Sequence, residues 1–258
     1  MSGSFSLMLF STDPDWIAEN VAAGVSAIVV DWECNGKVTR QSGADTQIGT
    51  DTLEDLERVR AATDARVICR INGYGEATRR EVDQAISAGA DEILLPMVMN
   101  VTQVGRTLDH ARGRCGVGIL IETLEAVENA ESIAALPITR AYLGLNDLAI
   151  ARRAPSIFNA LVDGTLATVR PFFDVPFGFG GLTLPEKGCP VPCRLLMSLM
   201  AGNHASFSFL RRSYHRDIAG REPRTEVPRI LAAIESARRR SDGDFARDVQ
   251  ELAGMLAA

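Results

Sequence analysis

Two carboxylates stand where a protein could bind a metal ion. Glu122 follows the apolar run GVGILI, Asp147 closes the segment AYLGLND, and a helix-like stretch comes after each of them. In a barrel of alternating parallel strands and helices, the carboxyl ends of the strands converge on one face, so acids on consecutive strands become neighbours. Such a pair could bind one hard divalent cation and leave coordination positions open for an oxygen-rich substrate.

Short apolar segments alternate with helical patterns along the whole chain. The predicted strands are 6–10, 26–33, 66–72, 92–98, 116–123, 141–147, 176–183 and 205–212. The predicted helices include 52–63, 76–88, 101–112 and 124–136. The strands are apolar at successive positions, as in strands covered on both faces, and the helices repeat apolar residues at spacings of three and four. Eight such units in 258 residues predict a closed (β/α)8 TIM barrel, because the first loop lacks the GxGxxG motif of an open dinucleotide-binding sheet.

Polar and charged side chains gather at one end of these predicted strands. They are Asp31, Glu33, Arg70, Asn72, Pro96, Glu122, Thr123, Asn146, Asp147, Arg211 and Arg212, with Pro96 as the apolar exception. One such residue is ordinary where a strand gives way to a loop, but Glu122, Asp147 and Arg70 together predict a site. A guanidinium can fork onto a carboxylate or an enolate oxygen and stays charged, so we expect Arg70 to bind substrate. We also expect substrate contacts from Pro96, Thr123 and Asn146.

The composition narrows the classes of function. The chain is 46% hydrophobic and 23% charged, without a composition break, which favours a single domain over residues 1–258. A net charge of −6 with scattered Lys and Arg argues against a nucleic-acid partner. The N-terminus has no basic segment followed by a long apolar core, and no apolar run reaches membrane-spanning length. We therefore expect a cytoplasmic protein without a membrane partner.

Two other kinds of site fit the sequence poorly. No lysine stands at a strand end suited to Schiff-base chemistry, because Lys37 falls in a loop and Lys187 follows shortly after a proline, so metal-assisted chemistry is favoured. Five cysteines are an odd number, which argues against a disulfide framework. Cys189 and Cys193 have three residues between them and no second ligand pair, which argues against a zinc site.

Five segments resemble those of a known enzyme family. VVDWE, CRING, GADEILLPMV, LIETLEAVENAESIAALP and LGLNDLA are similar, in order and spacing, to the metal-dependent aldolases and citrate lyase β-subunits of the HpcH/HpaI type. The resemblance runs from about residue 24 to residue 149. It implies a phosphoenolpyruvate-binding type of barrel in which Glu122 and Asp147 bind Mg or Mn and Arg70 holds a keto acid. The expected function is a carbon–carbon lyase that makes or consumes pyruvate, oxaloacetate or a related 2-keto or hydroxy-keto acid.

The sequence departs from the family pattern after the second predicted strand. Sugar-acid aldolases of this family place a basic histidine there, whereas this chain has Asp31-Trp32-Glu33-Cys34. The base would then come from Asp31, Glu33, a metal-bound water or a later residue such as His215. A lone histidine in a loop is more often simply exposed and has no catalytic role. The following stretch, 35–47, is either a substrate-contacting loop or a solvated one.

Two alternative functions remain open, and the tail suggests association. A citrate-lyase-like or malyl-CoA-like enzyme would cleave an acyl thioester, although no feature marks a coenzyme A site. A barrel that has lost its base could instead be a keto-acid-binding or scaffold subunit. Residues 227–258 carry two helical patterns, 227–239 and 245–256, which is more helix than one barrel unit needs. The stripe of Val249, Leu252 and Leu256 must be buried, so we expect a homo-oligomer.

Overall fold

The computed structural model describes residues 4–34 and 51–257, which form a closed barrel of eight parallel strands in sequence order. The strands are β1 (Ser6–Phe10), β2 (Ala27–Asp31), β3 (Arg66–Arg70), β4 (Glu92–Leu95), β5 (Gly116–Ile121), β6 (Arg140–Leu143), β7 (Phe177–Leu182) and β8 (Phe207–Leu210). β1 pairs with both β2 and β8, which closes the ring. The predicted (β/α)8 barrel is therefore confirmed. The loop predicted at 35–47 lies outside the described residues.

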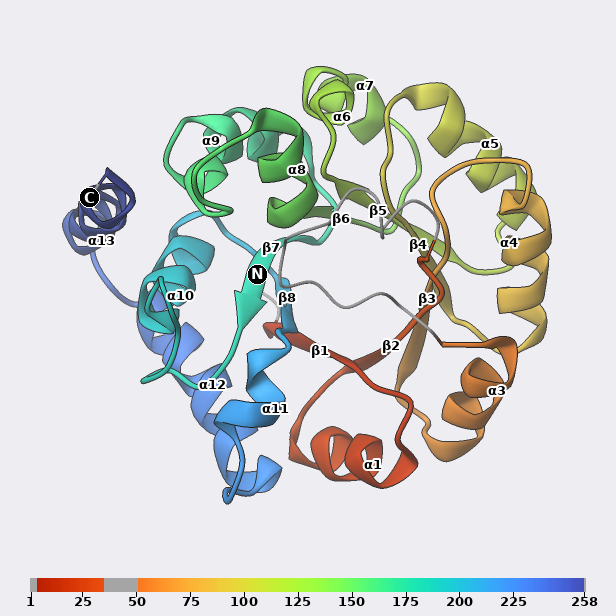
Figure 1. Ribbon diagram of the computed structural model, residues 1–258, viewed down its shortest axis with the longest axis horizontal. Helices are drawn as coiled ribbons and strands as arrows, with labels where there is room; N and C mark the ends of the chain where they lie inside the picture. The colour runs from red at the N-terminus through yellow and green to blue at the C-terminus, as the bar shows by residue number, and fades with distance from the viewer. Residues whose placement is uncertain (1–3, 35–50, 258) are drawn as a thin grey trace.

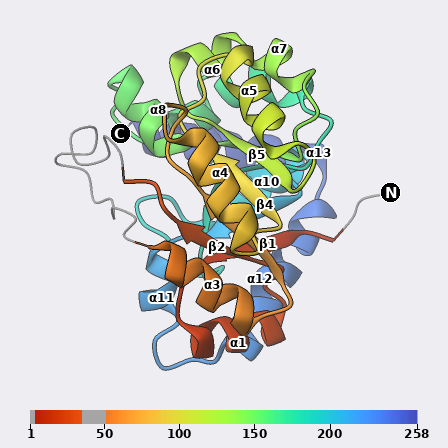
Figure 2. The same cartoon turned by 90° about the vertical axis from the view of Figure 1, so that its right-hand side faces the viewer.

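Helices cover the outside of the barrel (Figure 1), and Figure 2 shows α3, α4 and α5 along its outer surface. The helices are α1 (Pro14–Ala23), α3 (Leu53–Ala62), α4 (Thr78–Ser87), α5 (Val101–Ala111), α6 (Leu124–Glu128), α7 (Ala130–Ala134), α8 (Leu145–Arg152), α9 (Thr165–Val169), α10 (Cys193–Gly202), α11 (Ser213–Asp217), α12 (Pro223–Arg238) and α13 (Asp242–Ala257). Two short 3-10 turns, η1 (Asn159–Leu161) and η2 (Arg170–Phe172), flank α9. No helix among the described residues is long and apolar enough to cross a membrane.

Two predicted strands end three or four residues early in the structure, and one predicted helix is divided. The fourth strand stops at Leu95 instead of residue 98, since Pro96 has no N–H to donate to a ladder and Met97 has a φ of 53°. The helix predicted over 124–136 is divided into α6 and α7 at Asn129. The sixth strand ends at Leu143, so Asn146 and Asp147, predicted at the strand end, lie in the first turn of α8.

The barrel interior and the outer shell form two separate apolar clusters. The interior cluster contains only strand residues, among them Met8, Leu94, Leu120, Phe207 and Phe209. A larger cluster packs the other faces of the strands against the helices. This division explains the consecutive apolar residues of the strands, because both strand faces are buried.

A buried ion pair lies at the end of the barrel where the strands begin. Arg140, the first residue of β6, forks onto Glu92, the first residue of β4, with Nε–Oε1 and Nη2–Oε2 distances of 2.5 and 2.7 Å. Arg66 Nη1 lies 3.1 Å from Glu92 Oε2, and the Arg140 guanidinium stacks over Phe207 at 5.0 Å. Two cations therefore satisfy one buried carboxylate at this end.

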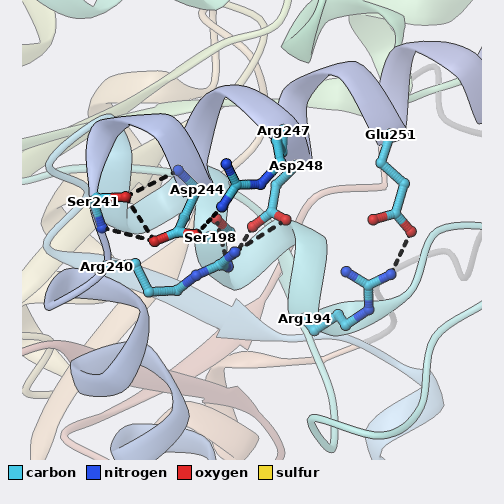
Figure 3. A network of polar contacts seen from close by, with 8 residues as sticks. All are labelled: Arg194, Ser198, Arg240, Ser241, Asp244, Arg247, Asp248 and Glu251. Carbon is cyan, nitrogen blue, oxygen red and sulfur yellow. Dashed lines mark hydrogen bonds and ion pairs between the residues drawn. The ribbon is translucent and has the colours of Figure 1, made fainter.

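The tail helix α13 packs on α10 of its own chain (Figure 1). Figure 3 shows the polar contacts of this helix: Arg240 binds Asp248, Arg194 pairs with Glu251, and the Ser241 hydroxyl accepts from the Asp244 N–H at 3.2 Å. Leu252 is fully buried in the core of the same chain, and Val249 and Leu256 are partly buried there. The apolar stripe is thus covered without a partner subunit, and association through residues 227–258 stays a prediction that light scattering can test.

Candidate active site

A two-point ion pair joins the ends of β2 and β3. Asp31 and Arg70 are the last residues of these strands and are paired in register. Arg70 Nε donates to Asp31 Oδ1 at 2.8 Å, and Arg70 Nη2 donates to Oδ2 at 2.6 Å. The guanidinium also lies over the Phe10 ring, 5.2 Å from its centroid. Burial opposes the charge of Arg70, but the carboxylates of Asp31, Glu33 and Glu122 together outweigh burial and raise the pKa of Arg70.

The turn after β2 holds a second carboxylate against the same guanidinium. Glu33 is buried, and its Oε2 lies 3.3 Å from Arg70 Nη1. The Glu33 N–H donates to Asp31 Oδ1 at 3.1 Å, and the Asp31 N–H donates to Asp51 Oδ2 at 2.8 Å. Trp32 Nε1 donates to the Thr52 carbonyl at 2.9 Å. These bonds fix the turn and therefore the direction of both acids.

A buried polar chain from α4 fixes Cys34. The Cys34 N–H donates to Asn72 Oδ1 at 3.0 Å. Asn72 in turn donates to the Glu81 carboxylate from its backbone N–H at 3.0 Å and from Nδ2 at 2.9 Å. The sequence did not indicate this role of Glu81, because an acid within an amphipathic helix is normally expected to be a surface residue. Its buried position beside the β3 loop is visible only in the folded chain.

Glu122 directly follows β5 and is held by backbone on two sides. Its Oε1 accepts the Met97 N–H at 2.9 Å. On the other side a Cβ added to Gly144 would lie 2.7 Å from Glu122 Cβ and closer still to Oε2, so only glycine fits there. Burial, followed by the nearby charges of Glu33 and Asp147, raises the pKa of Glu122 to about 8. The sequence carries no direct signal for this role of Gly144.

Three carboxyl groups thus lie near the Arg70 guanidinium at the mouth of the barrel, and a fourth, that of Asp147, lies near Glu122. Asp31, Glu33, Glu122 and Asp147 are all buried, and Arg70 is the cation among them. The described residues contain no group of three or more His, Cys, Asp and Glu that would complete a metal cage. The excess of buried negative charge, with Glu122 beside Asp147, nevertheless fits a hard divalent cation whose other ligands are substrate and water oxygens.

Comparison with known proteins places the chain in a family. Residues 5–156 match the model of the HpcH/HpaI aldolase/citrate lyase family, which is more than half of the chain. The chain belongs to this family. No curated protein sequence matched the chain. Membership supports a lyase or aldolase activity, a small keto-acid substrate and the divalent-metal dependence that is general in the family.

Solved structures of HpcH/HpaI and citrate-enzyme barrels share the fold. An HpcH/HpaI aldolase from Desulfitobacterium hafniense DCB-2 has 15% identity and a TM-score of 0.66, covering 93% of this chain and 95% of its own. A citrate lyase from Burkholderia xenovorans LB400 has 15% identity and a TM-score of 0.61, covering 98% and 92%. The citrate synthase SbnG has 17% identity and a TM-score of 0.61, covering 91% and 93%. At these identities the likeness shows the fold alone.

The remaining predicted residues of this HpcH/HpaI barrel have different surroundings. Thr123 is the N-cap of α6: its hydroxyl accepts the Ala126 N–H at 3.0 Å and donates to the Val98 carbonyl at 2.6 Å. Pro96 is buried and Asn146 is exposed. His215 is exposed on α11 and stacks on Trp16, with centroids 5.3 Å apart. The structure thus brings Arg70, Asp31, Glu33, Glu122 and Asp147 together, and gives Thr123 a capping role.

Proposed function

We propose that this HpcH/HpaI barrel is a divalent-metal-dependent carbon–carbon lyase that forms or uses the enolate of pyruvate or a related 2-keto acid, such as oxaloacetate. The observation that carries the proposal is that the buried Glu122 lies near both the buried Asp147 and the Arg70 guanidinium. Breaking a carbon–carbon bond beta to a carbonyl leaves an enolate, which needs concentrated positive charge. The mouth of the barrel contains one such positive charge, on Arg70, and two acids, Glu122 and Asp147, that could bind a cation.

Glu122 and Asp147 are the residues that would hold Mg²⁺ or Mn²⁺. When bound, the ion supplies Lewis-acid stabilisation of the negative charge that develops on the keto oxygen. Glu122 is kept in place for this role by the Met97 N–H and by the close approach of Gly144. Its raised pKa also supports the assignment, because a bound cation would offset both the burial and the repulsion from Glu33 and Asp147 that raise this pKa.

Arg70 would bind and orient the keto acid. Asp31 engages the Nε and Nη2 atoms of Arg70, which turns Nη1 toward Glu33 and the region next to Glu122. A guanidinium has five N–H groups, so donors remain for a substrate carboxylate or enolate oxygen. Asp31 is in this view a positioning residue, because both of its oxygens bind Arg70.

Glu33 is the residue that we assign to proton transfer. It is buried beside the Arg70 guanidinium and close to Glu122, so a substrate held by Arg70 would lie next to it. It would take the proton from the substrate directly or through water. The other candidates for the base are less suitable. Both oxygens of Asp31 already accept hydrogen bonds from Arg70, and His215 packs against Trp16 on the surface.

Exchange of the pyruvate methyl protons in deuterated water, followed by NMR, tests this function without knowledge of the second substrate. We expect exchange that needs Mg²⁺ or Mn²⁺, is lost in chelator, and is lost in Glu122→Gln and Asp147→Asn. Asp83→Asn, which removes an exposed surface acid paired with Arg114, is the matched control and should exchange at the wild-type rate. Exchange that persists after exhaustive chelation would refute the metal assignment.

The same assay separates the two other functions that the sequence allows. A keto-acid-binding or scaffold barrel would bind metal and pyruvate, detected by calorimetry, without any exchange. An acyl-thioester lyase would turn over CoA esters and leave free hydroxy-keto acids uncleaved.

A further inference from the structure

An apolar cleft opens directly beside Glu122. It has a volume of about 570 Å³ and is formed by the loops after β3, β4 and β5 together with residues of α5, α6 and α8. This volume lies in the range of pockets that enclose small organic ligands. Glu122 belongs to its lining, so a molecule in the cleft would touch the proposed metal site. The apolar wall consists of Tyr74, Met97, Met99, Leu124 and Ala151. A second cleft, of about 540 Å³, lies between α3 and α4, and its lining includes no residue of the site.

The rim of the cleft carries apolar side chains that water reaches. Met99 is 39% exposed and Leu124 is 41% exposed. Only six large apolar side chains are this exposed in the part of the chain that the structure describes. Two of these six, Met99 and Leu124, line this one cleft. Exposed apolar side chains gathered at a concave surface mark a place where an apolar group binds.

Met97 links the cleft wall to the proposed metal ligand. Its φ of 53° is left-handed, a conformation that costs a non-glycine residue on the order of 1–3 kcal/mol. In this conformation the Met97 N–H donates to Glu122 Oε1 at 2.9 Å while its side chain lines the cleft. One strained residue thus fixes both the carboxylate and the apolar wall next to it.

The charges around the cleft disfavour an anionic occupant. Among the described residues, the lining contains no Lys, Arg or His, and it contains the acids Glu122 and Glu125. Arg106 is exposed and hydrogen-bonds Tyr74, but it is not one of the residues that line the cleft. A carboxylate or phosphate in this cleft would lose water without gaining a counter-charge, which is costly. An uncharged apolar group loses nothing comparable.

We infer that this cleft binds the part of the substrate that is not the keto acid, and that this part is an uncharged aldehyde or ketone with an apolar chain or ring. The inference rests on the proposed lyase function. In the cleavage direction the bond between C3 and C4 of a 4-hydroxy-2-keto acid breaks, and its electron pair stays on C3 as the enolate. The C4 hydroxyl loses its proton to the base and becomes the carbonyl of the released product, and C3 then takes a proton. In the reverse direction the enolate adds to that carbonyl.

A pair of aldehydes of equal ring size tests the inference. We would measure Mg²⁺-dependent addition of pyruvate to benzaldehyde, to 4-carboxybenzaldehyde and to glycolaldehyde. Benzaldehyde should have a kcat/KM at least about tenfold above both others, the ratio expected for about 1.4 kcal/mol of selective binding. A wild-type preference for the carboxylated or the small polar aldehyde, or no use of benzaldehyde, would overturn the inference.

Two arginine variants show whether the cleft itself sets the preference. Leu124→Arg, in the cleft, should lower the ratio of benzaldehyde to 4-carboxybenzaldehyde at least about tenfold, because it supplies the missing counter-charge. Ile157→Arg is the matched control, since Ile157 is also 41% exposed and does not line the cleft. It should keep the wild-type ratio, and equal effects of both variants would contradict the inference.

Pyruvate proton exchange, measured in parallel, separates the two proposals. Metal-dependent exchange combined with the wrong aldehyde preference overturns the cleft assignment and leaves the lyase proposal standing. Absence of exchange and of addition to any aldehyde overturns both.

Discussion

Two arginines of the barrel each form a two-point ion pair with a carboxylate. Substituting each of them by lysine separates an effect on catalysis from an effect on stability. Arg70 forks onto Asp31 where the strands end, and Arg140 forks onto Glu92 where they begin. Both pairs are largely buried, with side-chain exposures of 17% and 13% for the first and 10% and 0% for the second. Arg→Lys at either position keeps the charge but removes the two-point geometry.

The expected stability loss is similar at the two ends. Lysine has a single ammonium group and cannot satisfy both carboxylate oxygens at once, so each variant loses about one charge-assisted hydrogen bond. Such a bond contributes on the order of 1.5–3 kcal/mol to the free energy of unfolding. Urea unfolding should therefore show comparable decreases for Arg70→Lys and Arg140→Lys, with both variants remaining folded.

The expected catalytic losses differ. Arg70→Lys should lower kcat/KM for pyruvate proton exchange at least about tenfold, or about 1.4 kcal/mol of transition-state stabilisation, because the donor geometry toward the substrate changes. Arg140→Lys should keep kcat/KM close to wild type, since that pair lies at the opposite end of the barrel. Wild-type kinetics in Arg70→Lys would show that Arg70 is structural, and equal losses in both variants would show that barrel integrity alone controls the rate.

Three further results are expected. The metal-free Glu122 carboxyl, with its pKa raised from 4.5 to about 8, should make Mn²⁺ affinity in calorimetry increase with pH up to about 8. It should also make the metal-free protein less stable in urea as the pH rises from 4.5 to 8, because the unfolded chain loses this proton first; a flat profile would contradict the shift. Gly144→Ala should weaken Mn²⁺ binding at least about tenfold by displacing Glu122, whereas Gly105→Ala, where an added Cβ contacts nothing, should not. Glu33→Gln should slow pyruvate exchange by about a hundredfold or more and His215→Ala should not, and the opposite ranking would move the base to α11.

The sequence alone was sufficient to predict the barrel and the main charged residues at its mouth. Consecutive apolar residues identify strands buried on both faces, and the first polar residue after such a run lies at the strand end, which located Arg70 and Glu122. Asp147 was found for the same reason, although it lies in the first turn of α8. The strand was predicted too long because Gly144 and Leu145 continue the apolar run into the helix.

The parts that sequence reasoning missed depend on contacts between distant segments. Glu81 and Asp51 bind polar groups of other elements, and nothing in their local sequence differs from an exposed acid. Met97 adopts a left-handed backbone conformation, which the presence of a methionine does not predict. Glycine is required at position 144 because a Cβ there would collide with the side chain of Glu122, which lies 22 residues earlier in the chain. Each of these features arises from packing in three dimensions, whereas periodicity reports only which face of an element is buried.

The balance of charge distinguishes the functional end of the barrel from the structural one. At the end where the strands begin, Glu92 has two arginine partners, Arg66 and Arg140, so its negative charge is fully compensated. At the mouth, Arg70 faces the buried Asp31, Glu33 and Glu122, and the buried Asp147 lies near Glu122. Folding alone would not favour such an excess, because each unpaired buried carboxylate costs stability or takes up a proton. A bound cation would compensate this excess, which is why we propose that the chemistry takes place at that end.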